Sequence, residues 1–318
     1  MHKKLFIHSG LHKTGSTTIQ FFSNKYRENL LTSGLNYPLY IDKKNQKHQS
    51  HLQLIKDIFK DEIDFNSTSS ISTSHARSFL ESLALKASRD RQNILLSAES
   101  ISSLSKHRLL SLAQLMRSIF KEFTIIFVFF LRDQRDLAES LYKNGFRAMV
   151  KRQQNIDLFL RDRKSYFDYS QRFDDHQDIS SQLDDLSFVY FNYPTRVSLL
   201  EHFFKFLSVD IGNFSTLSSP LVKNPSLDCI DCIAKDNLQL LLPDRDENLR
   251  FNKFASQNKI STAYRFIDSL SDPDLLDFLQ WNYSHMSSEK INVSTRVLKP
   301  ITFEALSLAQ QRLSQFLG

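Results

Sequence analysis

The chain of 318 residues is longer than a typical single domain, and its 41% hydrophobic and 24% charged residues are an ordinary balance for a globular protein. Its 41 Lys and Arg against 35 Asp and Glu give a formal charge of +6, which favours anionic partners such as nucleotides, acidic glycans or membrane surfaces. The composition excludes a chain that is disordered throughout, and no cluster of basic and aromatic residues predicts a nucleic-acid interface.

The apolar runs are too short for a signal peptide or a membrane span. The start, MHKKLFIHSG, has only a brief apolar run, and the longest such run, IIFVFFL, covers residues 125–131. We therefore expect a cytoplasmic protein without an integral membrane segment, whereas the oligomeric state is left open. Cys229 and Cys232 form one C-x-x-C pair, which is one pair short of a tetrahedral zinc site, so we expect no metal centre.

Apolar runs alternate with amphipathic stretches from the beginning of the chain. The run KLFIHSG predicts a strand that ends in a loop, and residues 16–31 follow with apolar positions at helical spacing. The Ser/Thr-rich residues 65–75 predict a loop. After this loop we expect a helix at 76–88 and a second buried strand within QNILLSAES, residues 92–100.

The strongest strand candidate is FTIIFVFFL, residues 123–131, which is continuously apolar, as expected of a strand covered on both faces. Helices are predicted before and after it, at 109–120 and 137–150. A fourth strand is predicted at 186–192, a helix at 198–207, and mostly helices thereafter.

This alternation predicts an α/β fold, a parallel sheet flanked by helices with a mostly helical C-terminal portion. We expect one domain over residues 1–318. Its α/β core would extend to about residue 210, with a helical extension over about 211–318.

The stretch GLHKTGSTTIQ has features of a phosphate-binding loop. Gly10 and Gly15 have the spacing of the G-x-x-x-x-G-K-S/T loop, but Ser16 follows the second glycine and the lysine, Lys13, lies inside the loop. The glycines would let backbone N–H groups close around an anion, with Lys13, the hydroxyls of Ser16 and Thr17, and the next helix N-terminus facing it. The alternative is a tight strand-to-helix turn with a surface lysine.

The loop resembles the 5′-phosphosulfate loop of the sulfotransferases that use 3′-phosphoadenosine 5′-phosphosulfate (PAPS). In that family the lysine lies inside the loop and is followed by a glycine and a pair of hydroxyl residues, as in the residues HKTGST here. The resemblance implies a P-loop NTPase-like sulfotransferase fold. It also implies that Lys13 contacts the oxygen bridging phosphate and sulfate, where charge grows as the S–O bond breaks. The cofactor-binding residues of this loop would be His12, Lys13, Thr14, Gly15, Ser16 and Thr17.

Two further strand ends are similar to the same family. Arg132 follows the third predicted strand and Ser140 lies eight residues later, and the resemblance implies that the two hold the 3′-phosphate of PAPS. Glu99 follows ILLSA, where the family places a His or Glu that accepts the proton of the acceptor hydroxyl. The alternative for Glu99 is an exposed acid at a helix N-terminus, and His12 and His107 are alternative bases.

The sequence departs from the small-molecule branch of the family, because Thr18 stands where a tryptophan often stacks on adenine. The resemblance therefore implies a bacterial or glycan-type sulfotransferase that acts on a hydroxyl of a saccharide, polysaccharide or glycolipid. Two other interpretations stay open. One is a P-loop kinase-like phosphotransferase that would use Asp133 to bind magnesium, and the other is a non-catalytic nucleotide- or glycan-binding protein of the same fold.

Overall fold

The computed structural model covers two compact units of the chain. The first unit comprises Met1–Arg132 and Gln171–Lys223, and the second comprises Asp133–Ser170 and Asn224–Gly318. The structure describes residues 3–10, 14–60, 75–148, 155–192, 199–212, 214, 228, 230–232, 234–235, 245–257, 265–266, 271–275, 278–279 and 303–317. Within these residues, no helix is both long and apolar enough to cross a bilayer.

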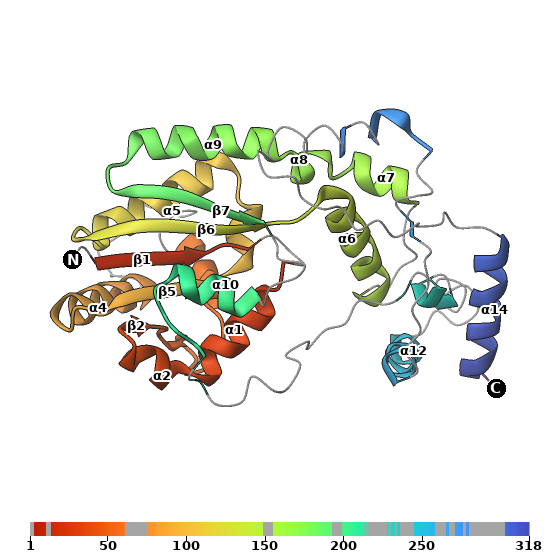
Figure 1. Ribbon diagram of the computed structural model, residues 1–318, viewed down its shortest axis with the longest axis horizontal. Helices are drawn as coiled ribbons and strands as arrows, with labels where there is room; N and C mark the ends of the chain where they lie inside the picture. The colour runs from red at the N-terminus through yellow and green to blue at the C-terminus, as the bar shows by residue number, and fades with distance from the viewer. Residues whose placement is uncertain are drawn as a thin grey trace. The chain divides into compact units, whose positions relative to one another are not determined.

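Five parallel strands form the sheet of the first unit, in the order β2-β5-β1-β6-β7 (Figure 1). A separate antiparallel hairpin pairs β3 with β4. The bounds are β1 Lys3–His8, β2 Leu35–Asn36, β3 Tyr40–Ile41, β4 Lys47–His48, β5 Asn93–Ser97, β6 Phe123–Leu131 and β7 Leu186–Asn192. The predicted α/β class with a parallel sheet is confirmed, and the four predicted strands are β1, β5, β6 and β7.

Helices cover both faces of this sheet (Figure 1). Phe127 of β6 shares an apolar core with α4 and α5, whereas the next residue, Val128, shares a second core with α1 and α10. Because both faces are buried, the β6 run is apolar at every position but Thr124. The helices of this unit are α1 Ser16–Lys25, α2 Arg27–Thr32, α3 Leu52–Ile58, α4 His75–Arg89, the 3-10 helix η2 Glu99–Ser103, α5 Lys106–Ile119, α10 Leu199–Phe206 and most of α9 Tyr169–Gln182.

The single helix predicted over residues 16–31 is divided into α1 and α2. Tyr26 separates them with φ −107° and ψ 30°, which lies outside the helical range. Its ring packs 4.7 Å from that of Phe22 and 5.7 Å from that of Phe214, measured between centroids. The apolar spacing continues across this break, so the prediction of one uninterrupted helix was wrong.

Helices make up most of the described part of the second unit. Its helices are α6 Gln134–Ala148, α7 Ile156–Arg161, α8 Lys164–Phe167, α12 Arg245–Gln257 and α14 Phe303–Leu317. A buried ion pair joins α14 to Asp231, whose Oδ1 lies 2.8 Å from Arg312 Nε. Residues 133–170 belong to the same unit as the C-terminal helices. The sequence-based division had instead placed them with the α/β core.

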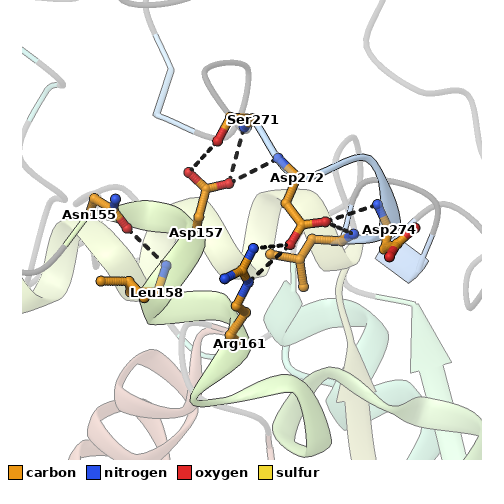
Figure 2. Close-up of polar contacts among 8 residues, drawn as sticks. Asn155, Asp157, Leu158, Arg161, Ser271, Asp272 and Asp274 are labelled. Carbon is orange, nitrogen blue, oxygen red and sulfur yellow. Dashed lines mark hydrogen bonds and ion pairs between the residues drawn. The ribbon is translucent and has the colours of Figure 1, made fainter.

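A polar network joins α7 to residues 271–275 (Figure 2). Asp157 accepts hydrogen bonds from the N–H and the hydroxyl of Ser271, both at 3.1 Å, and from the N–H of Asp272 at 3.2 Å. Arg161 donates to Asp272 Oδ2 from Nε at 3.0 Å and from Nη2 at 2.6 Å. This guanidinium lowers the pKa of Asp272, so the pair anchors these distant segments to each other within the second unit.

Candidate functional site

The topology of the sheet singles out the carboxyl ends of β1 and β6. From β1 the chain leads through α1 and α2 to β2, on the β5 side of the sheet, whereas from β6 it leads to β7 on the opposite side. Connections that diverge from adjacent parallel strands mark the point where open α/β sheets bind ligands. The predicted loop follows β1 at this point.

Polar atoms converge around Gly10, two residues after the end of β1. A Cβ atom at Gly10 would lie 2.5 Å from Ser16 Oγ, 2.8 Å from His8 Nε2 and 3.1 Å from Thr14 Oγ1, so only glycine fits here. The side chains of His8, Thr14 and Ser16 are all buried. Ser16 Oγ and His8 Nε2 have no hydrogen-bond partner among the described residues. Since buried polar atoms are normally hydrogen-bonded, this pair is suited to a polar ligand beside Gly10.

The first turn of α1 adds a positive potential at the same place. Gly15 precedes the helix with φ 81°, a left-handed conformation that favours glycine. Because Gly15 has no side chain, it cannot cap the first turn, and that turn contains no acidic residue. The positive end of the helix dipole is therefore available to an anion.

His8 is held by a chain of hydrogen bonds from β5 and α1. Its neighbour in the β1–β5 register is Ser97, and His8 Nδ1 lies 2.8 Å from Ser97 Oγ. Gln20 of α1 donates from Nε2 to the same oxygen at 3.2 Å. The hydroxyl proton of Ser97 is then available to Nδ1, so we assign the ring proton of neutral His8 to Nε2, the atom beside Gly10.

Burial keeps His8 uncharged. The centroid of its ring lies 5.9 Å from that of Phe130 and 5.1 Å from that of Phe203. Desolvation lowers the pKa of His8 to about 3, although the Glu99 carboxylate acts in the opposite direction. At neutral pH the imidazole therefore presents an uncharged N–H donor at Gly10.

Glu99 lies near the same strand end. The N–H of Ala98 donates to the carbonyl of His8 at 3.0 Å, and Glu99 begins η2 directly afterwards. The Glu99 side chain is partly buried and interacts electrostatically with His8. Ser102 holds the turn, because its hydroxyl donates to the Glu99 carbonyl at 2.7 Å and its own carbonyl accepts from Arg172 Nη1. The structure thus brings the predicted base and the predicted loop to adjacent strand ends.

Arg132 and Ser140 belong to different units. Val128 of β6 pairs with His8 of β1. Arg132 lies four residues after Val128, which corresponds to roughly 13 Å beyond His8 along the strand direction at the rise of a β-strand. Ser140 is buried on α6. Neither unit contains both residues, so their joint contact with a 3′-phosphate stays a prediction.

The remaining predicted residues of the loop and the alternative bases differ in position. His12 and Lys13 lie outside the described residues. Thr17 is exposed on the first turn of α1 and is not among the atoms that converge at Gly10. His107, an alternative base, is exposed on the first turn of α5.

Comparisons with models of protein families, with curated proteins and with solved structures found no match to this chain. In the described part of the chain, no group of three or more His, Cys, Asp or Glu side chains is arranged to hold a metal ion. Asp133, the magnesium ligand of the kinase-like interpretation, instead caps α6, since its Oδ1 accepts from the N–H of Asp136 at 3.0 Å. Cys232 is buried, and Cys229 lies outside the described residues.

Three residues of this site were missed in the sequence: His8, Gln20 and Ser97. A polar residue at the end of an apolar run, such as the histidine in KLFIH or the serine in NILLS, was a usable signal for two of them. Their pairing depends on the register of β1 with β5, which the sequence does not display.

Proposed function

We propose that this chain transfers a sulfuryl group from PAPS to an acceptor hydroxyl, on a P-loop NTPase-like sulfotransferase fold. The observation that carries the proposal is the convergence of His8 Nε2, Ser16 Oγ and Thr14 Oγ1 on Gly10. This cluster lies between the carboxyl end of β1, the central strand, and the N-terminus of α1, where the helix dipole is positive, as expected of a phosphate-binding loop. The resemblance of the loop to that of PAPS-dependent sulfotransferases supplies the nucleotide and the reaction.

The residues around Gly10 fit a phosphosulfate group, because His8 and Ser16 offer hydrogen-bond donors to an oxyanion and none of the three residues there is acidic. His8 and Ser16 would donate from buried, unpartnered atoms, which makes each bond stronger than its equivalent at an exposed position. Lys13 would add a full positive charge, as the resemblance implies. PAPS supplies an activated sulfuryl group, and these residues would bind and orient it and stabilise the charge that develops on the leaving phosphate.

Glu99 is proposed to accept the proton of the acceptor hydroxyl. It lies at the strand end next to His8 and is partly removed from water, as suits a carboxylate that takes a proton at neutral pH. Ser102 and Arg172 fix the backbone of η2 and would keep Glu99 at one position relative to the loop. The acceptor is proposed to be a saccharide, polysaccharide or glycolipid hydroxyl.

The test is transfer of label from radiolabelled PAPS to a panel of oligosaccharides without magnesium. We expect labelled product from the wild type and at least about a hundredfold less from Glu99→Gln, with nucleotide affinity unchanged. Ser23→Ala is a matched control, because Ser23 is a buried residue of α1 whose hydroxyl is outside the Gly10 cluster.

Retained transfer by a Lys13→Ala/Glu99→Ala double variant would contradict the mechanism. Nucleotide binding without transfer to any acceptor would favour the non-catalytic interpretation. A requirement for ATP and magnesium would favour the kinase-like interpretation.

A further inference from the structure

A cleft of about 450 Å³ opens in the first unit between the end of α3, η2 and the start of α5. This volume is within the range of small-molecule sites in proteins. Its lining contains three apolar residues, one serine and three cations. These are Ile55, Phe59, Leu104, Ser100, Lys56, Lys60 and Arg108.

The charged side chains that line the cleft, among the residues that the structure describes, are all cationic. No acidic residue is among the described residues that line it. Asp57, which follows Lys56 in the sequence, is engaged elsewhere, since it accepts from the Tyr40 hydroxyl at 2.6 Å and from Gln53 Nε2 at 2.8 Å. Lys56 and Lys60 lie one turn apart and are both exposed. The cleft is therefore suited to a ligand that carries negative charge.

The same lining provides an apolar surface beneath these cations. Ile55 and Phe59 are largely buried in the core, and Leu104 packs against that core. The guanidinium of Arg108 lies 5.4 Å from the centroid of the Phe59 ring, which holds this cation next to the apolar residues. A ligand with both anionic groups and an apolar face would match the two parts of the lining.

The cleft adjoins the proposed base. Ser100 lines it and directly follows Glu99 in η2, the turn that Ser102 and Arg172 hold. A molecule that contacts Ser100 in the cleft would therefore lie next to the backbone of the proposed base. In the proposed reaction the acceptor must approach Glu99, so this cleft is the candidate place for the acceptor, apart from the nucleotide at Gly10.

We propose that this cleft binds the acceptor and that the acceptor is an acidic oligosaccharide. Its carboxylate or sulfate groups would pair with Lys56, Lys60 and Arg108, while the apolar face of a sugar ring would rest against Leu104 and the residues beneath it. The inference rests on the proposed function, because it takes Glu99 as the base that meets the acceptor. It narrows the acceptor from saccharides in general to those that carry negative charge.

The experiment is a calorimetric titration of the whole chain, without nucleotide, with trigalacturonic acid and with its trimethyl ester. The two share one skeleton and differ in charge. We expect the acid to bind at least about tenfold more tightly than the ester, and raised salt to weaken the acid alone. A Lys56→Gln/Lys60→Gln/Arg108→Gln variant should lose this preference. The matched control Lys44→Gln/Lys86→Gln/Lys121→Gln removes three exposed charges that do not line the cleft. This control should keep the preference for the acid.

Equal affinities for the acid and the ester would overturn the proposal. An equal loss of the preference for the acid in the two triple variants would overturn it as well. Tricarballylate, which has three carboxylates and no sugar, should bind more weakly than trigalacturonic acid, and equal affinity would also overturn the assignment.

The nucleotide separates this inference from the proposed function. The cleft variant should bind 3′-phosphoadenosine 5′-phosphate (PAP), the desulfonated nucleotide, as tightly as the wild type. If the wild type fails to bind PAP, the sulfotransferase proposal fails, whereas the preference for the acid would still support an acidic-saccharide site.

Discussion

His8 and Ser97 face each other across the β1–β5 register, with His8 Nδ1 2.8 Å from Ser97 Oγ. Because Ser97 Oγ also accepts from Gln20, the serine can direct its own proton to His8. The imidazole Nε2–H is then oriented toward Gly10. A side chain of β5 and one of α1 thus position a donor of β1 at the candidate anion site.

Ser97→Ala tests this arrangement. Without the hydroxyl, His8 can adopt the other tautomer and turn an acceptor toward the anion, so we expect PAP to bind about tenfold more weakly. Calorimetry measures the affinity, and nitrogen NMR of the imidazole reports the tautomer directly. Ser23→Ala, which removes a buried hydroxyl farther along α1, should leave both unchanged. An Nε2–H tautomer that persists in Ser97→Ala would refute the assignment.

Gly10→Ala should weaken anion binding strongly, and it should also cost stability because the added methyl would clash with buried side chains. The added methyl would lie 2.5 Å from Ser16 Oγ and 2.8 Å from His8 Nε2, so it would block the place where these donors are proposed to meet an oxyanion. We expect PAP affinity to fall by more than about tenfold in calorimetry. Gly34→Ala is the control for a loss of stability alone. Gly34 has φ +80° and no atom near an added Cβ, so its substitution should cost about 1 kcal/mol of stability and leave PAP affinity unchanged. Equal affinities of wild type and Gly10→Ala would count against the site.

Stability should fall as the pH decreases from 7 to 5. Desolvation lowers the pKa of His8 and His176 to about 3 and that of His51 to about 4, against an ordinary value of 6.5. The unfolded chain binds protons below about pH 6.5 that the folded chain does not, so the folded state loses stability in this range. Each histidine should contribute about 2 kcal/mol of this loss at pH 5.

Denaturant unfolding at the two pH values, followed by circular dichroism, measures this loss. His51→Gln should show a smaller difference between pH 7 and pH 5 than the wild type. A free energy of unfolding that is equal at both values would contradict the burial of these imidazoles as neutral groups.

Arg312→Leu should destabilise the second unit by about 3 kcal/mol, because it leaves Asp231 buried without its cation. Both side chains are almost fully covered, at 7% and 4% exposure, and burial raises the pKa of Asp231 despite the guanidinium. The Arg312→Leu/Asp231→Leu double variant should recover much of the loss. Hydrogen exchange of the α14 amides measures the effect, and a double variant less stable than Arg312→Leu would show that the pair is not the cause.

The parts of the fold that were predictable are those with a long apolar signal. The β6 run could be recognised because burial on both faces makes nearly every position apolar. The two-residue strand Leu35–Asn36 and the hairpin of β3 and β4 are too short to show any period. Tyr26 divides α1 from α2 through its backbone conformation, which leaves the apolar spacing intact.

The candidate site was predictable where its residues are consecutive in the chain. The spacing of Gly10 and Gly15 and the hydroxyl at Ser16 indicated an anion site, and the structure brings these residues together. His8 and Ser97 are 89 residues apart, and only strand register makes them neighbours. Contacts of this kind follow from the folded structure and not from a local motif.

Titration with PAP tests whether this chain binds a 3′-phosphorylated nucleotide. The wild type and Arg132→Ala are compared in calorimetry with PAP, ADP and ATP, all without magnesium. We predict that the wild type prefers PAP to ADP, which lacks the 3′-phosphate, and that Arg132→Ala weakens PAP binding by about a hundredfold while ADP is unaffected. A preference for ATP, or equal PAP affinity in the two proteins, would contradict the account.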